Sequence, residues 1–225
     1  KDRPKWLTVS GGSINYVNKI INFLKANPRV KLLKNNGVKK IKRENGFIKV
    51  TDNEGNTSKV DHIIFSQNPS KVINILSDIQ KKELDILGKF KANKNTAYLH
   101  SDESIMPKTK KIWSSWNIFV PKDEKNHISV TYWMNKLQNI NNKTPIFLSL
   151  NPVRLPNEGS IFKVIDYEHP IFDSKSIIAL KFLDEIQGLN NTWYCGAWSG
   201  NGFHEDGLNS SLKVANKLGI KALWD

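Results

Sequence analysis

Residues 191–215 read Asn191-Thr-Trp-Tyr-Cys-Gly-Ala-Trp-Ser-Gly-Asn-Gly-Phe-His-Glu-Asp-Gly-Leu-Asn-Ser-Ser-Leu-Lys-Val-Ala215. The pattern predicts a short buried strand, a glycine-rich turn and a helix that begins near Asp206. Glycines let the turn pass close to a ligand, and the first helical turn offers unpaired N–H groups to anionic or carbonyl oxygens. These glycines are Gly196, Gly200, Gly202 and Gly207. The segment is therefore a candidate cofactor cradle, and the alternative is an ordinary strand–turn–helix junction.

From Gly196 to Ser210 the order is Gly-Ala-x-x-Gly-x-Gly-Phe-His-Glu-Asp-Gly-Leu-x-Ser. This order resembles the C-terminal flavin motif of the FAD-dependent amine oxidase and phytoene desaturase superfamily. Within it, the chain is similar to NAD/FAD-binding amine-oxidase-like proteins linked with cyclopropane fatty acid synthesis. Other stretches that fit this group are Trp6–Val17, Asp61–Ser66, Leu99–Asp102, Met106–Pro107, Trp113–Asn117, Thr131–Gln138, Leu150–Pro152 and Glu168–Pro170. The resemblance covers nearly the whole chain.

The pyrophosphate-binding unit of that superfamily has no counterpart in this sequence. Such proteins begin with a strand, a Gly-x-Gly-x-x-Gly turn and a helix, followed by an acidic residue for the ribose. The nearest stretches, Ser10–Ser13 and Gly200–Gly202, lack this spacing. Together with the abrupt start at Lys1, this leads us to expect the C-terminal portion of a longer flavoprotein.

The resemblance implies an α+β chain that is part of an α/β flavoprotein. We expect a β-rich substrate domain at residues 77–185. Residues 1–76 and 186–225 would form the C-terminal parts of a Rossmann-like FAD domain whose first βαβ unit is missing.

The resemblance also implies a flavin site around the glycine-rich turn. The implied cofactor-binding residues are Val38, Gly196, Ala197, Gly202, Phe203, His204, Glu205, Asp206, Gly207 and Leu208, with Val38 near the adenine. The N–H groups of Asp206 to Leu208 would face the pyrimidine edge of the flavin, where negative charge develops on reduction. The carboxylates of Glu205 and Asp206 would repel a pyrophosphate unless they bind ribityl or ribose hydroxyls. Their alternative role is acidic capping of the helix start.

The implied substrate site lies in two aromatic stretches and one glycine pair. Large flat side chains and amides can line an apolar tunnel with a few fixed polar groups, although aromatic residues on strands more often form a core. Glycines before a helix let the backbone approach substrate or flavin, and their alternative role is a simple loop. The residues are Gly11, Gly12, Trp113, Trp116, Asn117, Tyr132 and Trp133.

Hydrophobic periodicity predicts the remaining elements. We expect a helix over residues 14–26 that is capped by Ser13 and ended by Pro28. Strands at 30–33, 38–43, 47–51 and 59–66 would form an antiparallel meander with hairpin turns. Short helices are expected near 72–76 and 84–87, strands over 95–165, a helix over 174–187 and a strand over 192–195.

Composition sets wider limits. The chain has 225 residues, 39% of them hydrophobic, which is enough for one large or two small cores. A net charge of +13 favours anionic partners. Because the lysines are spread along the sequence, we interpret them as a solvated surface, with peripheral membrane contact as an alternative and no nucleic acid partner expected. A single cysteine excludes an internal disulfide and fits a cytoplasmic location.

No self-sufficient catalytic apparatus is visible. The five histidines are far apart in the sequence, and no two of them have the spacing of metal ligands. They are His62, His100, His127, His169 and His204. Cys195 lies in an apolar strand, and Ser199 is not in a Gly-x-Ser-x-Gly elbow. This suits a flavoenzyme, in which the cofactor carries the chemistry. The resemblance implies an FAD-dependent oxidoreductase with a lipid acyl chain as the possible substrate, and with FAD held by the full-length protein and lost from these residues alone. The alternative is a non-catalytic lipid- or protein-binding module without flavin.

Overall fold

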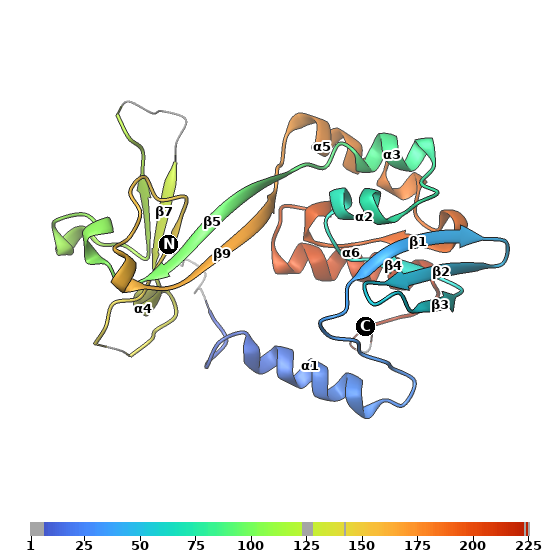
Figure 1. The fold of residues 1–225 in the computed structure, drawn as a ribbon, viewed down its shortest axis with the longest axis horizontal. Helices are drawn as coiled ribbons and strands as arrows, with labels where there is room; N and C mark the ends of the chain where they lie inside the picture. Colours follow the sequence, from blue (N-terminus) through green and yellow to red (C-terminus); the bar gives the residue numbers. More distant parts are fainter. Residues whose placement is uncertain (1–6, 123–127, 142, 223, 225) are drawn as a thin grey trace. The chain divides into compact units, whose positions relative to one another are not determined.

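The computed structural model describes residues 7–122, 128–141, 143–222 and 224 (Figure 1). Trp6 and His127, named above, lie outside them. The chain forms two compact units. The first comprises residues 1–32 and 94–167, and the second comprises residues 33–93 and 168–225. The chain passes between them along β5 (Ala92–His100) and β9 (Ile161–Pro170).

These units do not share the boundaries of the domains expected from sequence. Residues 77–93 and 168–185 belong to the second unit, and residues 7–32 belong to the first. The reason is packing, because Leu87 and Ala179 lie in the same hydrophobic core as Ile41 and Phe65. Which unit binds substrate and which binds cofactor stays a prediction.

The second unit contains the expected meander. It consists of β1 (Val38–Glu44), β2 (Phe47–Asp52) and β3 (Thr57–Val60), all antiparallel. Gly46 and Gly55 occupy the left-handed region at its two turns, with φ of +86° and +88°. Alternation buries Ile41 and Ile48 on one face of the ribbon.

Two strand predictions are wrong. Residues 30–33 form no strand, since Leu33 is exposed and no ladder pairs this stretch. The single strand predicted over 59–66 is two strands. Its first part is β3, and its second is β4 (Ile63–Phe65), which pairs in parallel with β10 (Thr192–Tyr194). The chain bends between them at Asp61, which ends the antiparallel ladder.

Polar side chains cap the N-termini of two helices of the second unit. The second unit contains α2 (Pro69–Ile75), α3 (Lys81–Leu87), α5 (Ser174–Leu180) and α6 (His204–Lys217). Asn68 accepts from the Ser70 N–H, and Asp173 accepts from the Ser176 N–H. The helix predicted over 174–187 ends at Leu180 and is followed by the 3₁₀ turn η4 (Leu183–Glu185).

The first unit is built on an antiparallel sheet with the order β6-β7-β8-β5-β9. Its further strands are β6 (Trp116–Phe119), β7 (Ser129–Trp133) and β8 (Phe147–Leu150). Met106, Trp113 and Phe147 form a small core on one face. Short helical turns connect the strands: η1 (Glu103–Ile105), η2 (Lys110–Ile112), α4 (Met134–Leu137) and η3 (Glu158–Ser160).

Helix α1 (Ile14–Ala26) has the predicted bounds and ends two residues before Pro28. Ser13 precedes it, but its backbone is helical and its side chain makes no capping hydrogen bond, so the predicted cap is wrong. No α1 residue is buried. Across the described part of the chain, no helix combines the length and apolar content that a membrane crossing requires.

Candidate functional site

The glycine-rich turn follows β10, whose pairing with β4 continues as the Cys195 N–H donates to the Phe65 carbonyl at 2.8 Å. Gly196 has φ +132° and ψ 162°, a conformation that is essentially confined to glycine. A Cβ at this position would lie 2.8 Å from the ring of Trp198. That ring packs edge-on against Phe90, with the centroids 4.8 Å apart. The turn is thus anchored in the core.

Ser210 ties this turn to α6. Its hydroxyl accepts from the Gly196 N–H and donates to the Gly207 carbonyl, both at 2.8 Å. Ser199 closes the 3₁₀ turn η6 (Ala197–Ser199) by donating to the Gly196 carbonyl at 2.8 Å. Ser210 was absent from the predicted site, although it ends the glycine-rich motif. Its contacts show that the motif fixes the geometry of its own loop.

Helix α6 begins at His204, two residues earlier than predicted. The Gly207 N–H donates to the Phe203 carbonyl at 3.3 Å, so this N–H belongs to the helical ladder. By the same i to i−4 geometry, the Leu208 N–H belongs to it too. The expectation that these N–H groups face a ligand is therefore wrong for Gly207 and Leu208, and for Asp206 it stays a prediction. The first-turn groups without an intrahelical partner are those of His204, Glu205 and Asp206.

Asp206 acts as a capping residue. Its carboxylate accepts from the Phe203 N–H at 2.9 Å. Gly200 makes room for this carboxylate, because a Cβ there would lie 2.5 Å from its Oδ1. Of the two roles left open for Asp206, the structure displays acidic capping. The carboxylates of Asp206 and the exposed Glu205 make the helix start better suited to a neutral carbonyl edge than to a phosphate.

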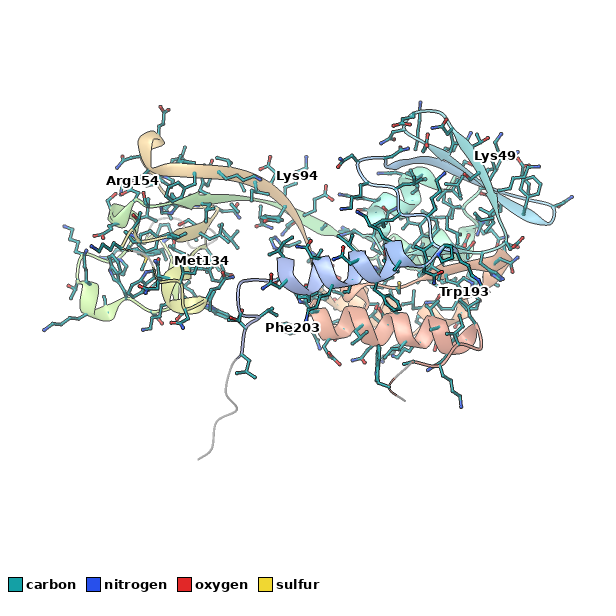
Figure 2. All side chains as sticks on the ribbon, turned by 90° about the horizontal axis from the view of Figure 1, so that it is seen from below. Lys49, Lys94, Met134, Arg154, Trp193 and Phe203 are labelled. Carbon is teal, nitrogen blue, oxygen red and sulfur yellow. The ribbon has the colours of Figure 1, made fainter. Side chains whose placement is uncertain are left out.

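The outer side of the helix start is apolar. Phe203 is 70% exposed and stands at the beginning of α6 (Figure 2). Leu208, five residues later in the helix, is also exposed. His204 is exposed beside them. Gly202 adopts φ +89° next to Phe172. Gly207 instead faces the turn, since a Cβ there would lie 3.6 Å from the Ala197 nitrogen. An exposed aromatic ring and open helix N–H groups are thus combined at the start of α6.

A buried charged network holds β10 in position. The guanidinium of Arg43 makes a bidentate ion pair with Glu83, at 2.7 and 2.8 Å, and contacts Asp78 at 2.8 Å. The hydroxyl of Tyr194 donates to Glu83 at 2.7 Å. Burial alone would raise the pKa of Glu83, but hydrogen bonds led by that from Arg43 outweigh it and lower the pKa. Burial and the neighbouring Glu83 charge raise the pKa of Tyr194.

This network and Gln187 were missed at the sequence level. The Gln187 amide bonds both backbone groups of Tyr194, at 2.9 Å to its N–H and 2.6 Å to its carbonyl. No local pattern marks these residues, because Arg43 and Glu83 both lie in segments that contain several other charged residues. The partners in this network are 35 to 111 residues apart in sequence. Tyr194 lies two residues before Gly196, so its contacts with the core fix the position of the turn.

A polar cavity of about 260 Å³ adjoins the turn between α6 and η4. Ser199 and Asp206 line it beside the turn, and Asp184 and Lys217 line it farther along α6 as an ion pair of 3.0 Å. This volume lies below the usual range for ligand pockets. The cavity therefore extends the cradle without enclosing a ligand by itself.

The predicted substrate residues lie on two opposite faces of the first unit's sheet. Residues directly opposite in an antiparallel pair share a face. Trp116 is opposite Tyr132, and Tyr132 is opposite Leu148, so all three share one face. Asn117 and Trp133 lie on the other face, where Trp113 packs edge-on against Trp133 at 5.4 Å.

The first of these faces, here called the apolar face, carries an aliphatic or aromatic residue at each paired position of β6, β7, β8 and β5. It comprises Trp116, Ile118, Val130, Tyr132, Leu148, Leu150, Leu99 and Ala97. Trp116 is 53% exposed and Ile118 67% exposed. An antiparallel sheet with one solvated face normally alternates polar and apolar residues. The apolar face is thus a surface suited to an apolar ligand.

The opposite face is core. The indole N–H of Trp113 donates to the Pro107 carbonyl at 2.7 Å, and the Asn117 amide bonds Ser114 and Thr131 backbone groups. These contacts correct the grouping made from sequence. Trp113, Asn117 and Trp133 pack inside the unit, whereas Trp116 and Tyr132 remain together on the apolar face, with ring centroids 5.8 Å apart.

The other predicted residues are not brought to the turn by any described contact. Gly11 and Gly12 form a turn before α1 in the first unit, with φ of +76° and +87°. Val38 begins β1 opposite Asp52, in a different sheet from β10. Their ligand roles stay predictions.

A buried serine–histidine pair in the first unit resembles a nucleophile and base. The His100 Nε2 lies 2.9 Å from the Ser149 hydroxyl, and Nδ1 accepts from the Asp102 N–H. Burial lowers the pKa of His100, which keeps the ring neutral. Both side chains are completely buried, so they cannot meet a substrate. In the described part of the chain, no group of three or more His, Cys, Asp or Glu residues is arranged for a metal.

The two units together define a mixed helix-and-strand fold that corresponds to about half of a flavin amine oxidase-type chain. Among solved structures, the chain is similar to the CLA-producing fatty acid isomerase from P. acnes, with a TM-score of 0.60 and 13% identity. The match covers 90% of this chain and 52% of that one.

A redesigned putrescine oxidase mutant matches with a TM-score of 0.58 and 11% identity over 93% of this chain and 53% of the other. Cyclohexylamine oxidase from Brevibacterium oxydans matches with a TM-score of 0.52 and 10% identity, over 81% and 48%. The chain thus spans about half the length of these enzymes, which are of the FAD-dependent amine oxidase type. No protein-family model and no curated protein matches the sequence.

Proposed function

We propose that this chain is the substrate-binding portion and the C-terminal FAD-domain portion of an FAD-dependent oxidoreductase of amine oxidase type. The observation that carries the proposal is the turn from Gly196 to Gly207. There, Gly196 has a backbone conformation confined to glycine, and the start of α6 lies beside exposed apolar side chains. The fold around them is similar to that of the fatty acid isomerase and the amine oxidases named above.

The residues of the turn fit the ring end of a flavin. Phe203 and Leu208 offer apolar contact, and the N–H groups of His204 to Asp206 offer donors to a ring carbonyl. A bound flavin would accept a hydride from a C–H bond of the substrate, while the adjoining C–N or C–C single bond becomes a double bond and a proton is released. The chain's own part is to hold the ring and to donate the open N–H groups of the helix start to its carbonyl edge.

The apolar face supports a lipid acyl chain as the substrate. Apart from the buried Ala97, its residues offer apolar contact, and the Tyr132 hydroxyl is the polar group among them. A small amine would need fixed polar or anionic partners, whereas an acyl chain needs contiguous apolar area. We also propose a link with cyclopropane fatty acids. We further propose a cytoplasmic location, which is consistent with the single cysteine being free and buried in the second unit.

Flavin binding tests the cofactor assignment. The 225-residue chain is expected to fold and to lose FAD on gel filtration, because the pyrophosphate unit contributes much of a dinucleotide site. Added FAD should bind weakly, as followed by quenching of flavin fluorescence. Gly207→Val should weaken this binding about tenfold, because its methyl groups would push α6 away from Ala197.

The matched control is Gly159→Val, since a Cβ at Gly159 meets nothing within 4 Å. Its FAD affinity should equal that of the original chain. If stoichiometric FAD survives gel filtration, the pyrophosphate unit is not needed for tight binding, and our assignment of the flavin end alone to this chain is wrong. If the two variants bind FAD equally well, the turn is not part of the flavin site. Absence of flavin from a longer protein carrying these residues would favour the non-catalytic lipid- or protein-binding module.

Acyl binding tests the apolar face. Trp116→Ala should weaken the binding of oleate, measured by equilibrium dialysis, about tenfold with an unchanged melting temperature, because this side chain is 53% exposed. Trp133→Ala should instead lower the stability of the first unit by about 3 kcal/mol, because its ring packs against Trp113. If Trp116→Ala leaves oleate affinity unchanged, the apolar face is not the acyl site.

A further inference from the structure

Helix α1 carries an apolar surface that its own unit leaves open. At 100° per residue, its apolar side chains occupy one half of the helix circumference. They are Ile14, Tyr16, Val17, Ile20, Ile21, Phe23 and Leu24. Tyr16, Ile20 and Phe23 form an exposed stripe along this half, and Phe23 is 68% exposed. The helix therefore presents contiguous apolar area of the kind that marks an interaction site.

The polar half of α1 and the segment after it carry only positive charge. Lys19 and Lys25 lie on the polar half with Asn15, Asn18 and Asn22. Arg29 and Lys31 follow within six residues of the helix end. No Asp or Glu occurs between residues 3 and 43. The positive charge of this region is thus uncompensated locally.

The apolar stripe and the positive charge together indicate what binds to α1. An amphipathic helix with aromatic and aliphatic residues on one side and lysines on the other lies in the interface of an anionic membrane. Clusters of four or more Lys or Arg beside such a helix bind anionic headgroups. A second copy of the chain would bring the same cations and the same net charge of +13, so pairing through α1 is opposed electrostatically.

We propose that α1, with Arg29 and Lys31, docks this protein onto an anionic phospholipid surface. The exposed stripe of Tyr16, Ile20 and Phe23 enters the boundary between headgroups and acyl chains. The four cations pair with lipid phosphates beside it. This interaction is peripheral, because α1 has 13 residues, too few to cross a bilayer.

Vesicle flotation of the 225-residue chain tests the proposal. Vesicles of phosphatidylcholine with about one third phosphatidylglycerol should carry the protein upward, and pure phosphatidylcholine vesicles should bind it at least tenfold less. Raising the salt concentration should weaken binding to the anionic vesicles. The double variant Lys19→Gln/Lys25→Gln should bind these vesicles about 25-fold less, at about fivefold per cation.

The stripe is tested by Ile20→Ser/Phe23→Ser, which should weaken vesicle binding more than tenfold. Because no α1 residue is buried, its melting temperature should equal that of the original chain. The matched control is Ile177→Ser/Ile178→Ser on α5, where both side chains are similarly exposed, at 54% and 55%. This control should bind vesicles normally.

Three results would overturn the proposal. The first is failure of the original chain to float with anionic vesicles. The second is equal loss of binding in the α5 control, which would mean nonspecific hydrophobic adsorption. The third is a dimer in gel filtration that the α1 stripe variant dissociates without any vesicle binding, which would identify a second copy or another protein surface as the occupant.

Discussion

Arg43→Ala is expected to destabilise the second unit by about 3–5 kcal/mol. The substitution leaves Glu83 completely buried without its cation and removes the bidentate pair and the contact with Asp78. Urea unfolding monitored by hydrogen exchange of the β10 amides measures the loss in this unit directly. The flavin affinity should fall together with stability, because Tyr194 is bonded to the same carboxylate.

Lys42→Ala is the matched control for Arg43. It lies next in sequence on the same strand, and its amine is 3.6 Å from Glu44 with the side chain 56% exposed. Such a surface pair contributes about 0–1 kcal/mol. If Arg43→Ala costs no more than Lys42→Ala, the buried network does not hold β10. The loss should also be partly recovered in Arg43→Met/Glu83→Met, since removing both charges leaves neither unpaired.

Gly196→Ala is expected to cost about 2–6 kcal/mol and to abolish the cradle. The cost has two parts, which are a backbone conformation that L-residues rarely adopt, at about 1–3 kcal/mol, and crowding of the new Cβ. This Cβ would lie 2.8 Å from Trp198 and 3.2 Å from the Ser66 carbonyl, which adds about 1–3 kcal/mol. Thermal unfolding and FAD titration measure the two consequences.

Variants at two other glycines separate the cost of the backbone conformation from the cost of crowding by the new Cβ. Gly46 has φ +86° with open space around it, so Gly46→Ala should cost only the backbone part, about 1–2 kcal/mol. Gly207 lies in a helix where a Cβ makes ordinary contact, so Gly207→Ala should be tolerated. Equal melting temperatures for Gly196→Ala and Gly46→Ala would show that the Trp198 contact yields easily and that the turn is not rigid.

The candidate site was only partly predictable. The turn from Gly196 to Gly207 and its position between a strand and a helix follow from glycine spacing and capping chemistry, which are local. The helix start was misplaced by two residues, because Asp206 caps from inside the first turn and not from the position before the helix. Which N–H groups remain open depends on that register alone.

The aromatic residues of the first unit show a different limit. Trp116 and Trp133 look equivalent in sequence, since both lie on strands with aromatic neighbours. The register of β6, β7 and β8 places them on opposite faces of the sheet. A side chain changes face with every residue, so a role for either residue required the register of all three strands.

By itself, the sequence determined the elements whose signals are local. These include α1 between Ser13 and Pro28, the meander with turns at Gly46 and Gly55, and the glycine turn before α6. The tertiary structure decided the parallel pairing of β4 with β10, which joins residues about 130 positions apart. It also decided the burial of Arg43 with Glu83 and the apolar face of the sheet. Each of these depends on contacts between distant segments, and the free energy of such contacts comes from burial and pairing that no local pattern records.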